Sequence, residues 1–353
     1  MTTSSPAPER SAALIVVRRA RRRRRTRRGL VVAGLSLAVL AAVVVSLTCG
    51  RTYYPPADVI DVIAGRTVPG ASYTVGTLRL PRTVLAVVAG ACFGLGGAAF
   101  QVMLRNPLAS PDIIGISAGA STAATFAVIV LSLSGPVVSV FGIVAALVVA
   151  LVVYLLSYRG GSASARLVLI GIGVAAMLYS ATSYILTLAT DWDLQAATRW
   201  LSGSLNNAAW PSVVPVVIAL AVLAPVLVYM DRTLRLLQIG DETATSLGVR
   251  VDRSRLLTTV VAVVLIAFAT SAAGPIAFAA FLAGPIAVRM LGPAGGAPLL
   301  PAALVGSLLV TVADFCGQFA FDNRFPVGVV TGVLGAPYLV YLIVRSNRSG
   351  GAL

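Results

Sequence analysis

The sequence predicts an all-α membrane protein of about ten transmembrane helices. Of its 353 residues, 58% are hydrophobic and only 11% are charged, whereas an ordinary soluble domain has about 25% charged residues. Apolar runs of about 20 residues, each long enough to cross a bilayer as a helix, recur along nearly the whole chain. An arginine run, "RRARRRRRTRR", stands directly before the first of them. Together these features indicate a polytopic membrane protein.

Ten apolar runs are the candidate spans. The seventh and eighth share residues 256–288, a stretch that is interrupted by Gly274-Pro275 and Gly284-Pro285 and is too short for two full crossings. Broken helices are tolerated in a membrane when protein buries their free backbone groups, so nine or ten crossings both remain open. We expect the spans at residues 30–48, 83–104, 113–131, 136–157, 166–189, 211–230, 256–273, 275–291, 300–320 and 327–344.

The arginines predict the orientation of these spans. The chain has no lysine, so all 27 of its basic residues are arginine, and with ten spans 21 of them fall on one side. Cytoplasmic segments carry the excess of basic residues, so we expect both termini in the cytoplasm. The six arginines left on the outer side are Arg51, Arg66, Arg79, Arg82, Arg199 and Arg324.

Three parts follow from this topology. Residues 1–29 are expected to form a disordered, cytoplasmic, arginine-rich tail, residues 30–345 the transmembrane domain, and residues 346–353 a second cytoplasmic tail. Nucleic-acid binding is the other interpretation of an arginine run. That interpretation leaves nine further spans unexplained.

The missing residue types exclude several kinds of chemistry. Without lysine there is no Walker A loop, and without histidine there is no HExxH zinc site and no Ser-His-Asp triad. Any ATP-driven work would therefore come from a partner chain. Cys49, Cys92 and Cys316 are far apart without a metal-type spacing, so no metal site is expected. Asp314 is the one acid that we expect inside a span, near its outer end, which gives proton or sodium coupling little basis.

The segment "RNPLASPDIIGISAGAS", Arg105 to Ser121, forms a polar cytoplasmic turn before the third span. Its prolines hold Asn106 and Ser110 out of the helical region. Asp112, near the start of the next helix, suits the positive end of the helix dipole. Close helix packing accounts for the glycines of this segment, but it does not account for the whole string.

The segment "LQIGDETATSLGVRVDRSR" is the longest cytoplasmic loop after the N-terminal tail. Gly240 or Asp241 can cap a short helix, and Gly248 can end it in a left-handed conformation. Ala244 and Leu247 are expected to share one face. The sequence therefore predicts a short helix with a small apolar face on the cytoplasmic surface, although a solvated connector is the simpler alternative.

Two further segments stand out. "DNRFPVGVVTGVLGAPYLVYL" places Gly328, Gly332 and Gly335 on one helix face, which indicates either a close helix contact or a surface that lines a pathway. "LRLPR" places Arg79 and Arg82 on the outer side, where arginines are scarce and need a reason.

Taken together, these segments resemble the FecCD-type permeases, which are the membrane subunits of binding-protein-dependent ABC importers for iron–siderophores, haem and vitamin B12. The resemblance covers about residues 30 to 345. It rests on six strings that occur here in the family's order: "LRLPR", "LRNPLASPDIIGISAGA", "WLSGSL", "GDETATSLGV", "AGPIAF" and "FPVGVVTGVLGAPYL".

The resemblance implies a type II ABC importer permease with ten helices in two inverted pseudo-symmetric halves. Two permeases, identical or paralogous, would form the path across the bacterial cytoplasmic membrane. Two ABC subunits would bind ATP and magnesium, and a siderophore-binding protein would deliver the cargo from outside. This chain itself would be neither an enzyme nor the holder of a cofactor. A ferric siderophore is the expected cargo, and vitamin B12 or haem is the alternative.

The resemblance also implies roles for particular residues. Arg79 and Arg82 would receive acidic side chains of the binding protein, although they could instead be interfacial anchors. Where the vitamin B12 permease has a further docking arginine this chain has Gln318, and Arg324 is expected to take over that contact. The ATPase-coupling residues would be Gly240, Asp241, Glu242, Ala244, Leu247 and Gly248. The cytoplasmic gate would comprise Asn106, Pro107, Leu108, Ser164 and Ala165.

Two other classes compete with this interpretation. A secondary transporter of a small lipophilic solute would work without any ATPase, but it would need ionisable groups within its spans. An integral-membrane enzyme would need acids or metal ligands clustered at one face, and the 12 acids here are scattered.

Overall fold

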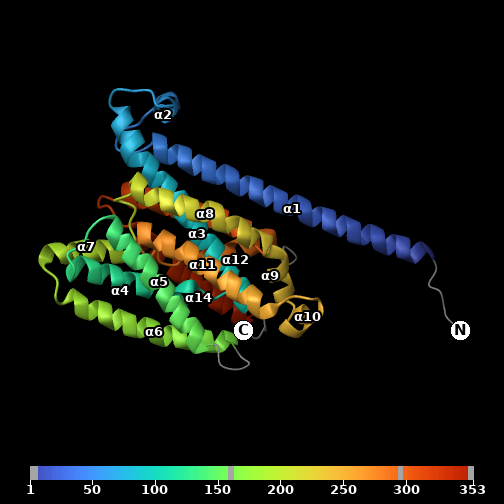
Figure 1. The fold of residues 1–353 in the computed structure, drawn as a ribbon. Coiled ribbons are helices and arrows are strands. Elements are labelled where there is room, and N and C mark those ends of the chain that lie inside the picture. The colour runs from blue at the N-terminus through green and yellow to red at the C-terminus, as the bar shows by residue number, and fades with distance from the viewer. Residues whose placement is uncertain (1–6, 158–162, 293–296, 349–353) are drawn as a thin grey trace.

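The computed structural model describes residues 7–157, 163–292 and 297–348, which form a bundle of helices (Figure 1). No strand occurs within these ranges. Seven of the helices found there are long and apolar enough to cross a membrane, and three shorter apolar helices accompany them. All ten lie where the sequence predicts spans. The chain is a polytopic all-α membrane protein.

The helix bounds agree closely with the predicted spans. The long apolar helices are α1 (Ala7–Thr48), α3 (Leu80–Leu104), α5 (Pro136–Ser157), α6 (Ala163–Leu186), α8 (Trp210–Tyr229), α11 (Val251–Ala273) and α13 (Leu299–Phe319). The shorter apolar helices are α4 (Ile116–Ile129), α12 (Ala279–Leu291) and the apolar part of α14 (Val327–Arg348). The remaining elements are α2 (Pro56–Ile63), the π-helix η1 (Ser72–Arg79), the 3₁₀-helix η2 (Pro111–Ile114), α7 (Asp191–Leu201), α9 (Asp231–Leu237) and α10 (Asp241–Ser246).

Helix α3 is the buried centre of the bundle. Within an 18-residue apolar stretch of the segment Ser72–Leu104, 89% of the residues are buried. In the corresponding stretches of α5, α6 and α8 only 22% of the residues are buried, so these helices leave their apolar faces outward. Helix α13 runs antiparallel to α3 and approaches it closely: a Cβ built on Gly90 would lie 2.4 Å from the carbonyl oxygen of Gly306, and one on Gly94 would lie 2.1 Å from that of Ala302. Only residues without a side chain at these positions allow two helix backbones to touch in this way.

The stretch shared by the seventh and eighth spans contains a break between α11 and α12. Gly274 has φ 70° and Phe278 has φ 60°, so the chain turns through left-handed conformations before α12 begins. Helix α12 has 13 residues, a length of about 20 Å against a hydrocarbon core of about 30 Å. By length, therefore, α11 can cross the membrane fully and α12 cannot do so alone.

The glycine face of the last span makes close contacts. A Cβ on Gly328 would lie 2.2 Å from the carbonyl oxygen of Ser202, and one on Gly335 would lie 2.4 Å from the Phe278 side chain. These distances favour the close helix contact over the pathway-lining surface.

The N-terminal segment differs from the expectation of a disordered tail. Helix α1 begins at Ala7 and continues unbroken through the arginine run into the first span. Arginine is a good helix former, and a helix that is already nucleated in the apolar run extends at low cost. Helices α2, α7 and α9 were also not anticipated, because each is short and lies in a connection.

The bundle has two distinct ends. Helices α2 and α7 lie at one end, called the α2 end here, and α9 and α10 lie at the opposite end, called the α10 end (Figure 1). Helix α3 begins at the α2 end and ends at the α10 end. The segments that the sequence singled out gather at these two ends.

Candidate functional site

At the α2 end, Arg82 lies in the first turn of α3 and forms an ion pair with Asp314 of α13. Its Nε donates to Asp314 Oδ2 at 2.8 Å and its Nη2 donates to Asp314 Oδ1 at 2.7 Å. The Arg82 and Asp314 side chains are 16% and 8% exposed. This is the two-pronged pairing that a guanidinium makes with a carboxylate.

Two amides complete this cluster. Arg82 Nη1 donates to Asn206 Oδ1 at 2.7 Å, and Gln318 Nε2 donates to Asp314 Oδ2 at 2.7 Å. Asn206, in the connection between α7 and α8, is exposed. We call these four residues, Arg82, Asn206, Asp314 and Gln318, the α3–α13 clasp. Each ion of the pair thus has one neutral partner besides the other ion.

Arg79 lies three residues earlier and has a different environment. Its Nη1 donates to the carbonyl oxygens of Leu47 at 2.9 Å and Thr48 at 3.1 Å, and its Nη2 donates to that of Thr52 at 2.7 Å. Its guanidinium also lies over the Tyr54 ring, 5.2 Å from the centroid. Because the last carbonyls of a helix lack intrahelical donors, Arg79 caps the end of α1.

Arg324 lies in the connection between α13 and α14, at the same end. It is exposed, and no ion pair joins it to another residue of the described chain. The structure therefore brings the three predicted docking arginines to one end of the bundle. Arg82 and Arg79 are already engaged within the chain, whereas Arg324 presents its charge to the surroundings.

At the α10 end, the predicted short helix is present as α10. Gly240 has φ 132° before it and Gly248 has φ 86° after it, so both glycines take backbone conformations that other residues rarely adopt. Asp241, the first residue of α10, accepts hydrogen bonds from Arg105 and, at 3.0 Å, from Arg255 Nη2. The helix is thus tied to the end of α3 and the start of α11.

The prediction that Ala244 and Leu247 share one apolar face of α10 is only half correct. Leu247 is 60% exposed and Glu242 is also exposed, but Ala244 is fully buried against the bundle. Leu247 has already left the helix as its C-terminal cap, so it does not share the direction of Ala244. Ala244 anchors α10, and Glu242 and Leu247 form its exposed surface.

The predicted gate loop follows α3 directly. Arg105 ends α3 with φ 53°, and its Nε donates to the Leu237 carbonyl oxygen at 2.8 Å. Asn106 Oδ1 accepts from the Leu108 backbone N–H at 2.8 Å, which closes a tight turn around Pro107. Asn106 and Pro107 are exposed and Leu108 is half-buried. Arg105 therefore connects the gate loop physically to α10.

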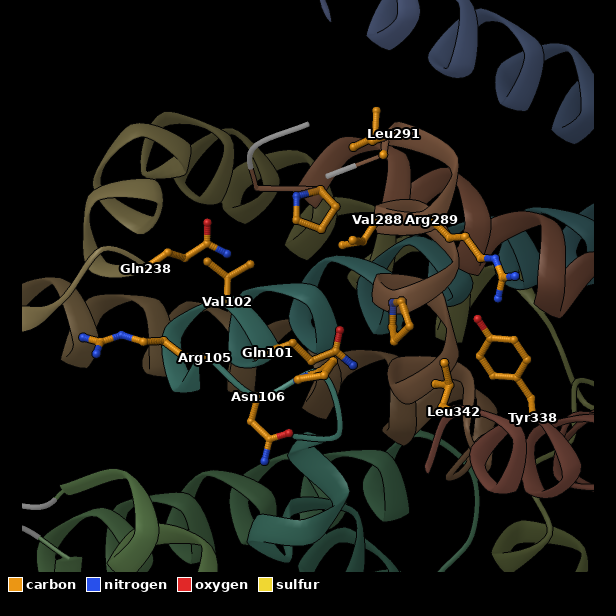
Figure 2. A pocket seen from close by; sticks show the side chains of 14 residues that line it. Gln101, Val102, Arg105, Asn106, Gln238, Val288, Arg289, Leu291, Tyr338 and Leu342 are labelled. Atoms are coloured by element: carbon orange, nitrogen blue, oxygen red, sulfur yellow. The ribbon is translucent and has the colours of Figure 1, made fainter. Parts of the chain in front are cut away.

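A cavity of about 580 Å³ adjoins this loop (Figure 2). Its lining comes from the ends of α3, α12 and α14 and from the α9–α10 connection. Its polar lining residues include Arg105, Arg289, Gln101, Asn106 and Gln238. Arg289 Nη1 donates to the hydroxyl group of Tyr341 at 3.1 Å and lies over its ring. Apolar side chains from α12 and α14 also line the cavity.

Two further gate candidates, Ser164 and Ala165, lie in the first turn of α6. Their side chains lie outside the described part of the structure, so this part of the predicted gate stays a prediction.

Asp112, in η2, is half-buried beside the gate loop. Ser117 and Ser110 donate their hydroxyl groups to its carboxylate, the latter at 3.3 Å. Burial raises the pKa of Asp112, and these two hydrogen bonds offset part of that rise. The carboxylate holds the turn that leads from the gate loop into α4.

The arginine run is largely exposed from Arg18 to Arg27. Its last two residues contact the bundle: Arg27 Nη2 donates to the Met290 carbonyl oxygen at 3.1 Å, and Arg28 lies 3.8 Å from Asp231. These contacts hold the C-terminal end of the arginine run against the bundle at the α10 end.

Sequence reasoning missed part of the clasp. Asp314 gave a signal, because an acid inside a span demands a partner, but neither Arg82 nor Asn206 could be identified as that partner. Within the described part of the chain, no cluster of three or more cysteine or acidic side chains could hold a metal ion.

The fold is that of a solved membrane transporter subunit. A structure described as an inward-facing metal-chelate type ABC transporter superposes with a TM-score of 0.81 and 23% identity, covering 90% of this chain and 99% of that one. At this identity the likeness shows the shared architecture alone.

The family follows from the sequence comparison. The chain matches the FecCD transport family over residues 14–345 and belongs to that family. FepG of Escherichia coli strain K12, named a ferric enterobactin transport system permease protein, is 39% identical over 328 residues, or 91% of this chain and 98% of FepG. CbrC of Dickeya dadantii strain 3937, named an achromobactin transport system permease protein, is 36% identical over 315 residues, or 88% of this chain and 90% of CbrC.

Proposed function

We propose that this chain is the permease subunit of an ABC importer that carries a ferric siderophore across the bacterial cytoplasmic membrane. The observation that carries the proposal is the α10 end, where an exposed short helix is joined through Asp241 and Arg105 to the predicted gate loop. Such a joint can pass the motion of a partner to the gate. The names of FepG and CbrC support the cargo class.

The α10 end faces the cytoplasm in this proposal, and the α2 end is the outer end. The excess of arginines at the α10 end supports this orientation. Both termini are then cytoplasmic, and the chain is a multi-pass protein of the cytoplasmic membrane.

The power comes from two partner ATPase subunits that bind ATP and magnesium. They contact the exposed Glu242 of α10 and Leu247, its C-terminal cap, and Gly240 and Gly248 define the length of the helix that they contact. The chain has no ATPase site of its own in this proposal, which its lack of lysine supports.

A second permease completes the path. FepD of Escherichia coli strain K12, which also bears the name ferric enterobactin transport system permease protein, is 33% identical to this chain. Two different permeases carry the name of one transport system there, which favours a paralogue over a second copy as the partner of this chain.

A siderophore-binding protein docks at the outer end. Arg82 and Arg324 offer guanidinium groups to its carboxylates, since such groups give orientation as well as attraction. Arg79 belongs to the same docking set, and it also supports the docking surface by fixing the end of α1.

The chelate leaves through the cavity beside Asn106, Pro107 and Leu108. Its lining combines polar residues, Arg105 and Arg289 among them, with apolar ones, so the cavity can accept a chelate that carries both kinds of group. A cobalamin import permease of Halobacterium salinarum is 36% identical over 274 residues, so cobalamin is the alternative cargo, with haem after it.

Uptake by the reconstituted importer tests the proposal. The chain is placed in liposomes with its partner permease, the ATPase and the binding protein, and ferric enterobactin, cyanocobalamin and haemin serve as labelled probes. ATP-dependent uptake of the ferric chelate is expected. Uptake by this chain alone on a proton or sodium gradient would identify a secondary transporter instead.

Coupling is tested at α10. Replacing Leu247 with Asp should leave chelate binding intact but reduce ATP-dependent uptake about tenfold or more, because the apolar contact with the ATPase is lost. Ile60→Asp is the matched control, since Ile60 is 64% exposed at the outer end and Leu247 is 60% exposed at the cytoplasmic end. Equal uptake by the Leu247 variant and the wild type would leave α10 a simple connector.

A further inference from the structure

The charge of the docking arginine Arg82 is already neutralised within the chain. The Nε–Nη2 side of its guanidinium is occupied by Asp314, and only the Nη1 side reaches the exposed Asn206. A carboxylate that approaches from outside therefore meets an ion pair rather than a free cation. It also meets the negative charge of Asp314 directly behind the guanidinium.

The clasp contains the groups that an exchange of partners needs. If Arg82 turns toward an incoming carboxylate, Asp314 keeps the hydrogen bond from Gln318 at 2.7 Å. A buried carboxylate left without any donor is strongly destabilising, so this amide lowers the cost of parting. Asn206 lies on the solvent side of Arg82, at the point where an external carboxylate would enter.

The clasp lies near the outer end of the α3–α13 seam, since Arg82 is in the first turn of α3 and Asp314 is in the last two turns of α13. Further inward, Ser307 Oγ donates to the Val87 carbonyl oxygen at 2.7 Å, and the backbones touch at Gly90 and Gly306. These inner contacts do not depend on charge. Opening the clasp would therefore release the outer ends of the two helices while the rest of the seam holds them together.

We infer that Asp314 is the resting partner of Arg82 and that docking exchanges it for a carboxylate of the binding protein, which releases the outer end of α13 from α3. Asp314 is then a positioning residue that sets the affinity of docking. This inference rests on the proposed function and names the in-chain competitor at its docking site. It joins docking to helix motion through one ion pair.

The affinity of docking is the first test. Binding of the soluble siderophore-binding protein to the permease–ATPase complex in nanodiscs is measured at low and at physiological salt. Asp314→Asn should lower the Kd about tenfold at low salt, because the competing charge is gone. Its Kd should also rise more steeply with salt than that of the wild type, since the guanidinium is no longer paired.

A matched variant separates competition from overall charge. Asp61→Asn removes an acid of the exposed Arg66–Asp61 pair at the same end and should change the Kd less than twofold. The inference is overturned if Asp314→Asn leaves the Kd unchanged, raises it, or lowers it only as much as Asp61→Asn does.

Two further measurements protect the test. If Asp314→Asn does not fold, the double variant Arg82→Asp/Asp314→Arg replaces it, because this variant keeps an ion pair but places an acid where the binding protein docks. Its Kd should rise about tenfold. A Kd equal to that of the wild type would overturn the inference. Spin labels at the exposed residues Leu78 and Phe321, in a chain whose three cysteines are replaced by alanine, should move apart on docking. An unchanged distance would contradict the release of α13.

The wild type separates this inference from the proposed function. A wild-type complex that neither docks a binding protein nor takes up a ferric chelate contradicts the proposed function itself. A wild-type complex that does both, together with an inert Asp314→Asn change, contradicts only the exchange of partners.

Discussion

Helix α3 has an arginine–aspartate pair at each of its ends, and the two pairs differ in burial. Arg82 and Asp314, at the α2 end, are 16% and 8% exposed, whereas Arg105 and Asp241, at the α10 end, are 40% and 42% exposed. Both pairs join α3 to a distant part of the chain. The same two side-chain types therefore make a firm attachment at one end and a solvated, adjustable one at the other.

The difference follows from what each pair attaches. Asp314 lies inside α13, a membrane span with close backbone contacts to α3, so the pair is enclosed. Asp241 begins a six-residue helix in a surface loop and shares its carboxylate with Arg255. Water weakens the Arg105–Asp241 pair, so breaking it costs less than breaking the enclosed pair at the α2 end.

The largest effect is expected from breaking the buried pair. Arg82→Ala should lower the free energy of unfolding by about 3–5 kcal/mol, because Asp314 is left buried without its cation. Chemical unfolding in detergent micelles measures the change, and Arg66→Ala, which breaks the exposed pair with Asp61, is the control. A loss as small as that of the control would mean that the two ends of α3 are alike.

A smaller effect is expected along the seam between the two pairs. Gly90→Ala should lower the free energy of unfolding by about 1–3 kcal/mol, because its methyl group would lie 2.4 Å from the Gly306 carbonyl oxygen. Gly34→Ala is the matched control, since a Cβ on Gly34 of α1 meets nothing within 4 Å. Equal free energies of unfolding for the two variants would show that the α3–α13 contact tolerates a methyl group.

The exposed pair should matter less for stability than for coupling. Asp241→Asn should change the free energy of unfolding by no more than about 1 kcal/mol, because the pair is solvated. Nucleotide-dependent uptake should nevertheless fall several-fold, since Arg105 no longer holds α10 to the gate loop. Unfolding and uptake are measured on the same preparation. A large loss of stability with unchanged uptake would show that the pair at the α10 end serves stability rather than coupling.

The smallest effect concerns the dependence of stability on pH. Burial raises the pKa of Asp112 in the folded chain, so the folded state binds its proton more tightly than the unfolded state does. This group therefore lowers stability as pH rises from its ordinary pKa through the raised one. Asp112→Asn should flatten that slope in unfolding measurements at a series of pH values. If the dependence of stability on pH is unchanged in Asp112→Asn, groups other than Asp112 cause it.

The sequence predicted the helices better than the contacts between them. A bilayer demands long apolar runs, so the ten spans could be located from hydropathy alone. The glycines of the last span indicated either a close helix contact or a pathway-lining surface, and Phe278, in the connection between α11 and α12, supplies a close contact. These features depend on local composition, and local composition is visible in one sequence.

Features that depend on distant residues escaped prediction. Arg82 and Asp314 are 232 positions apart, and no periodic pattern joins them. Ala244 was expected on an exposed face, but its burial is decided by the neighbouring elements rather than by its place in a six-residue helix. The arginine run was expected to be disordered because its charge was considered without the apolar helix that follows it.

The continuity of α1 has a consequence for the start of the chain. A helix of 42 residues is about 63 Å long, roughly twice the thickness of the hydrocarbon layer. Arg27 and Arg28 hold it where it leaves the bundle, so the remainder stands out as a stiff rod beyond the α10 end. A fluorophore attached near Ala7 would therefore sit at a fixed distance from the α10 end and report on whatever approaches that side.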